Sequence, residues 1–98
     1  MTDSKIEEEI RKALKAGFQV SFDDYRAIKN SNPKAYRQNV LKGLRLYRIL
    51  APHNSALLKL CEIHHLNLEQ IISEEYQKAM QLLWFCCVFR ILHHSNTT

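Results

Sequence analysis

The stretch NLEQIISEEYQKAMQLLWFCCVFRILH, residues 67–93, is the part of the sequence that decides the fold. Asn67 and Gln70 form a cap and capping box at its start, and no Gly or Pro interrupts it, so the sequence predicts one helix. That helix is roughly 40 Å long, whereas a domain of 100 residues has a radius of gyration of ~13 Å. It is therefore predicted to be either a central strut or a protruding arm. Its core stripe is predicted to consist of Leu68, Ile71, Ile72, Tyr76, Ala79, Leu82, Leu83, Cys86 and Phe89.

A second apolar side is present only in the last part of this helix. Trp84, Phe85, Val88 and Leu92 lie opposite the core stripe on a helical projection. A helix that is apolar all round is buried all round, so other helices of the chain or a second chain must cover this side. Because Trp and Phe are enriched at interface hot spots, the sequence favours a protein interface here, including a homodimer. Coverage within the monomer is the alternative.

Caps and breakers divide the rest of the chain into further helices. Gly17 predicts a left-handed end to the first helix, and Asn32 with Pro33 predicts the start of the third. Asn54 or Ser55 is expected to cap the fourth. Strand alternation and hairpin turns are not found, so the predicted fold class is all-α, a compact bundle of four to five helices with a long C-terminal helix, in one domain covering residues 1–98. The predicted helices cover residues 4–16, 22–29, 33–51, 56–65 and 67–93.

The predicted helix at 33–51 is amphipathic. Its apolar face carries Tyr36, Val40, Gly43, Leu44, Tyr47 and Leu50. Its opposite side carries Lys34, Arg37, Arg45 and Arg48, with Lys42 at the edge. A glycine in mid-helix costs roughly 1 kcal/mol relative to alanine. Because Gly43 lies on the apolar face, the close approach of another helix is expected there.

Positive charge is concentrated in the first half of the chain. The net charge is +4, but residues 1–50 carry eleven basic and six acidic side chains, whereas residues 51–98 carry three basic and four acidic ones. Residues 26–60 contain no acid at all. This pattern suits an anionic partner, either an acidic protein surface or nucleic acid. A solvated surface paired with acids of the same chain, such as Glu7, Glu8 and Glu9, is the alternative. The candidate residues for binding an anionic partner are Arg26, Lys29, Lys34, Arg37, Lys42, Arg45 and Arg48.

The junction CEIHHLNLEQ, residues 61–70, suggests a helix-turn-helix motif by its length alone. The second helix of that motif lies in the major groove and presents Arg, Lys, Asn or Gln to base edges. Here it carries Glu69, Glu74 and Glu75, which phosphates would repel. If nucleic acid is bound, the helix at 33–51 is the better candidate.

No metal, cofactor or catalytic site is predicted. Cys61 and His64 share a helix face, but their spacing to the other Cys and His residues matches no zinc motif. With three Cys in a chain expected to be cytosolic, disulfides are not predicted. The sequence has no glycine-rich phosphate loop and no nucleophile elbow, so an enzyme is not expected.

The compartment follows from the two ends of the chain. The N-terminal MTDSKIEEEIRK has no apolar signal core, which predicts a cytoplasmic protein. The apolar window from Ala79 to Leu92 is shorter than the ~20 residues of a membrane span, and it contains Gln81 and Arg90. No membrane association is predicted.

These features together predict a small non-enzymatic helical module that binds a protein partner stoichiometrically, as an adaptor, inhibitor or regulator, and that can self-associate. The alternative is a nucleic-acid-binding regulator that uses the basic face of the helix at 33–51.

Overall fold

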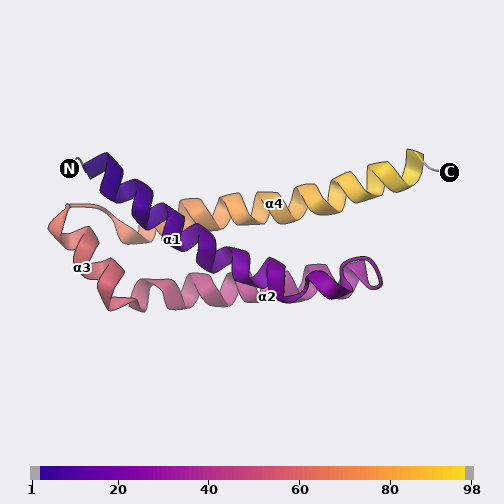
Figure 1. Cartoon of the computed structure of the whole chain (residues 1–98), viewed down its shortest axis with the longest axis horizontal. Coiled ribbons are helices and arrows are strands. Elements are labelled where there is room, and N and C mark those ends of the chain that lie inside the picture. The colour runs from indigo at the N-terminus through magenta and orange to yellow at the C-terminus, as the bar shows by residue number, and fades with distance from the viewer. Residues whose placement is uncertain (1–2, 97–98) are drawn as a thin grey trace.

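The computed structural model describes the backbone of residues 3–96 and, within it, the side chains of residues 4–85. In that part of the chain there are four α-helices, two short 3-10 turns and no strand, which confirms the all-α fold class (Figure 1). The helices are α1 (Asp3–Asp24), α2 (Pro33–Leu50), α3 (Ser55–Ile63) and α4 (Leu68–Asn96), and the 3-10 turns are η1 (Arg26–Ile28) and η2 (Ala51–His53).

Helix α1 is one continuous helix, so the prediction that it ends at Gly17 is wrong. Gly17 does not have a positive φ. The apolar side of Ile10 and Leu14 continues with Phe18 and Phe22, all four of which are buried. Burial of that side against α2 and α4 overrides the local stop signal. The separate helix predicted at 22–29 is reduced to the end of α1 and η1.

The other helix starts were predicted correctly because an asparagine caps each of them. The Asn32 side chain accepts a hydrogen bond from the Ala35 amide at 3.1 Å, and Pro33 follows at the first helical position. Asn54 accepts from the amides of Ala56 and Leu57 at the start of α3. Asn67 accepts from the Gln70 amide at 3.1 Å just before α4. Each cap satisfies amides that the first helical turn leaves unpaired.

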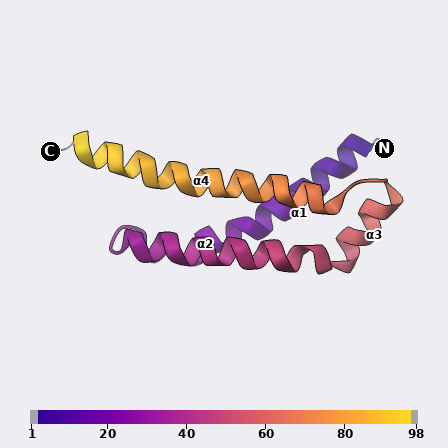
Figure 2. The ribbon, with the colours of Figure 1, turned by 180° about the vertical axis from the view of Figure 1, so that it is seen from behind.

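The three long helices contact one another, while α3 connects the end of α2 to the start of α4. Helices α2 and α4 run in opposite directions, and α1 crosses both obliquely (Figures 1 and 2). The buried core is formed by Ile10, Leu14, Phe18, Phe22, Tyr36, Val40, Leu44, Ala51, Cys61, Leu68, Ile71, Ile72, Ala79 and Leu83.

Both glycines lie where α1 crosses α2. A Cβ atom on Gly17 would collide with the ring of Tyr47, and a Cβ on Gly43 would collide with the side chain of Ser21. The Tyr47 ring also packs edge-on against Phe18, with ring centroids 4.7 Å apart. The close approach predicted at Gly43 is therefore confirmed, and Gly17 has the same role from the opposite helix.

The protein is elongated, with principal extents of 55 × 22 × 17 Å and a radius of gyration of 16.0 Å. This radius exceeds the ~13 Å expected for a compact chain of this length. The reason is visible in Figure 1, where α4 continues beyond the turn that joins α1 to α2. The first part of α4 packs against α1 and α2, and the later part projects past them.

Candidate functional site

The residues predicted to bind an anionic partner lie on α2 and on the turn before it. Lys34, Arg37, Lys42, Arg45 and Arg48 are on α2, and their side chains are exposed. Arg26 on η1 is exposed, whereas Lys29 is half-buried. The structure therefore brings most of these cations onto one helix.

Three of these cations have partners within the chain. Arg26 forms an ion pair with Asp23 at 3.3 Å. The Lys29 ammonium lies 5.7 Å from the centre of the Tyr36 ring, and the Arg48 guanidinium lies 4.6 Å from the centre of the Tyr76 ring. Such cation–π contacts contribute about 0.5–1 kcal/mol at exposed sites. Arg48 is thus directed toward α4.

The remaining cations of this set are not neutralised by acids of the same chain. Within residues 4–85, no carboxylate lies within ion-pair distance of Lys34, Arg37, Lys42 or Arg45. The acids suggested as partners for them pair elsewhere. Glu7 contacts Arg11 at 3.3 Å, and Glu9 contacts Lys12 at 3.6 Å, both within α1.

The outward side of α2 also carries large apolar side chains. Leu46, Ile49 and Leu50 are 57%, 64% and 55% exposed, so the prediction that Leu50 belongs to the core face is wrong. The helix ends at Leu50, and the core position is filled by Ala51 of η2. Sequence analysis did not single out Leu46 and Ile49, although their spacing places them opposite the core face. We call the set Lys42, Arg45, Leu46, Ile49 and Leu50 the α2 outer face.

A second exposed apolar surface lies on α4. Trp84 and Phe85 are each 64% exposed. The preceding residue, Leu83, is buried on the core side of the helix. Leu82, which was predicted to lie in the core stripe, is 47% exposed, so that prediction is wrong. The other predicted interface residues, Val88 and Leu92, lie outside the described side chains, as do Cys86 and Phe89 of the core stripe.

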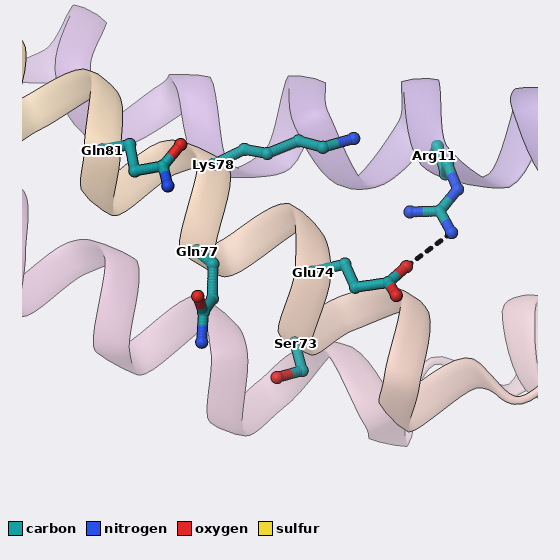
Figure 3. A pocket seen from close by; sticks show the side chains of 6 residues that line it. All are labelled: Arg11, Ser73, Glu74, Gln77, Lys78 and Gln81. Carbon is teal, nitrogen blue, oxygen red and sulfur yellow. Dashed lines mark hydrogen bonds and ion pairs between the residues drawn. The ribbon is translucent and has the colours of Figure 1, made fainter.

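A network of charged side chains, which sequence analysis missed, joins α1 to α4. Arg11 donates a hydrogen bond to Glu74 at 2.7 Å (Figure 3). It donates a second one to Glu75 at 2.9 Å. Lys78 donates a further bond to Glu75 at 3.0 Å. Glu75 is only 4% exposed, and these two cations balance its charge. No sequence signal identifies the contact, because Arg11 and Glu75 are 64 residues apart.

The environment changes the pKa values of these carboxyl groups. Burial raises the pKa of Glu75, but the hydrogen bonds from Lys78 and Arg11 outweigh it, and the net pKa is below the usual value. The hydrogen bond from Arg11 lowers the pKa of Glu74, and the bond from Gln70 adds to this effect. Both groups are therefore ionised at neutral pH.

A depression lies beside this network, and the charged groups that line it already form ion pairs. It measures about 580 Å³, and its lining side chains are polar (Figure 3). Its cations, Arg11 and Lys78, are already neutralised by Glu74 and Glu75. The lining residues are Arg11, Ser73, Glu74, Gln77, Lys78 and Gln81. We therefore assign these side chains a structural role, which is to join α1 to α4, and we do not treat the depression as a binding site.

The sequence predicted no metal site and no nucleophile, and both predictions concern the Cys, His, Asp and Glu side chains. Among the described residues, no three His, Cys, Asp or Glu side chains lie close enough to hold a metal ion. Cys61 is buried, and burial raises the pKa of its thiol, which keeps it protonated. Of the other Cys and His residues weighed for a metal, Cys86, Cys87, His93 and His94 lie outside the described side chains.

Comparison of the chain with protein-family models, with curated proteins and with solved structures gave no match. Over the described residues, no helix combines the length and the apolar character needed to cross a membrane. The candidate surfaces are therefore argued from this chain's own residues.

Proposed function

We propose that this protein is a small interaction module that binds a partner protein stoichiometrically, as an adaptor, inhibitor or regulator without catalysis. One observation carries the proposal: most of the exposed large apolar side chains among the described residues lie on two helices, while Val20, Leu58 and Ile63 are exposed elsewhere. Leu46, Ile49 and Leu50 are on α2, and Leu82, Trp84 and Phe85 are on α4.

The size of these side chains gives the proposal its energetic basis. Complete burial of one Leu, Ile or Phe side chain yields roughly 1.5–3 kcal/mol. Contiguous exposed apolar patches on soluble proteins mark binding sites more often than single exposed residues do. Trp84 and Phe85 are neighbours on α4, and each is 64% exposed, which leaves both accessible to a second molecule. Aromatic side chains of this kind often anchor protein interfaces.

The proposal includes the finer features expected from the sequence. The four helices act as one bundle with a long C-terminal helix, which is elongated and not compact as the sequence predicted. The protein is cytoplasmic, and it uses no cofactor or metal. The raised pKa of the buried Cys61 thiol argues against this cysteine as a catalytic nucleophile, because a catalytic thiol requires the thiolate.

Self-association through α4 is part of the proposal and is tested by sedimentation. We expect the full chain to sediment as a dimer at micromolar concentration, and the double variant Trp84→Glu, Phe85→Glu to sediment as a folded monomer. Gln81→Glu is the matched control, because it adds a charge at an exposed polar position of the same helix. A monomeric wild-type chain would remove the homodimer from the proposal.

Nucleic-acid binding is the second candidate, because Lys34, Arg37, Lys42 and Arg45 are exposed without acidic partners among the described residues. If about four phosphates are neutralised, the log-log salt slope on duplex DNA is about −3 to −4. Arg37→Ala and Arg45→Ala should then each reduce it by about one. No binding at 50 mM salt would eliminate this candidate.

Photo-crosslinking in the cells that produce the protein separates the two candidates. A photoreactive residue at position 46 or 84 is expected to give a protein adduct of fixed stoichiometry that survives nuclease treatment. An adduct that nuclease abolishes favours the nucleic-acid candidate instead. If neither position gives an adduct, the proposed function is wrong.

A further inference from the structure

The α2 outer face combines an apolar ridge with uncompensated positive charge. Its members occupy positions 42, 45, 46, 49 and 50, which is the spacing of one continuous helix stripe. The opposite side of α2 is already buried, because Tyr36, Val40 and Leu44 belong to the core. The stripe is therefore additional to what the fold requires.

The apolar part of this face is large enough to anchor a partner. Leu46, Ile49 and Leu50 are all more than half exposed and lie within about one helical turn. An interface that covers the exposed part of all three side chains removes apolar surface from water, which favours binding. A small apolar cluster of this kind can act as an interface hot spot.

The charged part indicates the chemistry of the partner. Lys42 and Arg45 lie beside the ridge, and no acid among the described residues is within ion-pair distance of either. The surrounding sequence, residues 26–60, contains no acid either. A complementary surface therefore presents carboxylates next to aliphatic side chains.

The shape of this face favours a helical partner. A single helix presents a convex ridge, and ridges of this type pack into the grooves between side chains of another helix. The described residues contain no strand, so they provide no sheet edge to which an extended peptide could add. A helix with carboxylates one turn from its aliphatic stripe places both groups correctly at once.

We propose that the α2 outer face binds an acidic amphipathic helix of a partner protein. This inference rests on the proposed function as a protein-interaction module, and it specifies the partner segment. Ile49 is the central apolar contact, and Lys42 and Arg45 receive the carboxylates.

Two other anionic partners fit this face less well. Phosphates of duplex DNA would bind the cations but would leave Leu46, Ile49 and Leu50 without apolar contacts. A membrane-surface helix buries an apolar face along its whole length, and it usually carries aromatic or leucine side chains throughout that face. The apolar part of this face is confined to the last residues of α2.

The test is a selection of helical peptides displayed on yeast against the folded full-length chain at physiological salt. One face of the displayed helix is randomised over acidic, basic, polar and aliphatic residues. The selected peptides are synthesised, and their dissociation constants are measured by fluorescence anisotropy for the wild type and three variants. These are Ile49→Ser, the double variant Lys42→Glu, Arg45→Glu, and the control Lys59→Glu, which reverses an exposed cation on α3.

We expect the selected peptides to carry Asp or Glu within one turn of a Leu, Ile or Val stripe. Ile49→Ser and the double charge reversal should each weaken binding by about tenfold or more, whereas Lys59→Glu should change it less than about twofold. Circular dichroism and thermal unfolding verify that each variant is folded. Selected peptides without acids, binding that is unaffected by the two outer-face variants, or no enrichment over the starting library would each overturn the inference.

Two further measurements complete the test. A 20-base-pair DNA duplex and vesicles containing phosphatidylserine are titrated with the same proteins. Suppose that the selection yields no acidic peptide, and that the wild type binds one of these probes while the double variant Lys42→Glu, Arg45→Glu does not. The face is then assigned to that probe, and the inference is overturned. If the inference about the α2 outer face fails, the proposed function still holds as long as a nuclease-resistant protein adduct forms at position 84. Failure of the proposed function is distinguished by the absence of any adduct.

Discussion

Arg11 on α1 and Arg45 on α2 carry the same charged group in opposite surroundings. Arg11 is partly buried and bonds to Glu7 within α1, and its bonds to Glu74 and Glu75 connect α1 to α4. Arg45 is exposed, and no described acid lies near it. The comparison between the contacts of α1 and the α2 outer face shows that charge has two different roles here. In the first region it supports the fold, and in the second it remains accessible to another molecule.

The largest effect is expected when the Arg11 contact is removed. Arg11→Ala leaves the buried Glu75 carboxylate with Lys78 as its single cationic partner, so we expect a loss of about 3 kcal/mol in the free energy of unfolding. Urea unfolding followed by circular dichroism measures it. Lys12→Ala is the control, because its pair with Glu9 is exposed and should contribute less than about 1 kcal/mol. A loss for Arg11→Ala as small as that of the control would contradict the assigned role.

The inner and outer sides of α2 should respond differently to the same side chain. Gly43→Val places atoms against Ser21, whose Cβ is only 2.9 Å from the position of an added Cβ, and should cost about 2 kcal/mol. Lys42→Val, one residue earlier and on the outer face, should cost only its helix propensity of about 0.5 kcal/mol. Thermal unfolding of both variants checks the difference. Equal losses would mean that the α1–α2 crossing is less tightly packed than the structure shows.

Low pH should weaken the contacts of Arg11 on α1 with Glu74 and Glu75 on α4. The pKa values of Glu74 and Glu75 lie below the usual glutamate value in the folded protein, so their contribution is complete near neutral pH and decreases as the pH falls through the lowered values. The wild type should therefore lose stability between about pH 5 and pH 3. Because Arg11→Ala has already lost its bonds to both groups, the difference between the two proteins should narrow over this range. Urea midpoints at several pH values test this; a difference that stays constant would contradict it.

The smallest effects are expected on the α2 outer face. Arg45→Ala and Ile49→Ser remove exposed side chains without internal ion-pair partners, so each should change the free energy of unfolding by no more than about 0.5 kcal/mol. Differential scanning calorimetry detects such changes as small shifts in Tm. A loss above about 1.5 kcal/mol for Ile49→Ser would show that this side chain packs within the chain, and would remove it from the proposed binding face.

The sequence predicted those features that depend on neighbouring residues. Asn32, Asn54 and Asn67 cap helices because the amides they bind are two or three residues away. The periodicity of α2 also depends on residues close in the sequence, and it correctly predicted that Tyr36, Val40 and Leu44 lie in the core. The all-α class follows from such local patterns and was confirmed.

Features that depend on distant contacts could not be predicted. Gly17 has the local character of a helix stop, but α1 continues because Tyr47 of α2 packs against it. Leu50 is on the apolar side by spacing, but the helix ends there and Ala51 takes the core position. The partners of Arg11 lie on α4, and no pattern within α1 indicates them. For the candidate site, the sequence located the basic residues but not the aliphatic side chains beside them.

The contact between Arg11 and Glu74 has a consequence for the order of events during synthesis. The two residues are 63 positions apart, and a ribosome adds about 5–20 residues per second, so Arg11 emerges roughly 3–13 s before its partner exists. In that interval α1 can pack only against α2, through the crossing marked by Gly17 and Gly43. Until α4 has been translated, Glu7 of α1 is therefore the acid available to Arg11 among its three partners, and the apolar side of α1 is only partly covered. Exposed apolar surface of this kind is prone to aggregation.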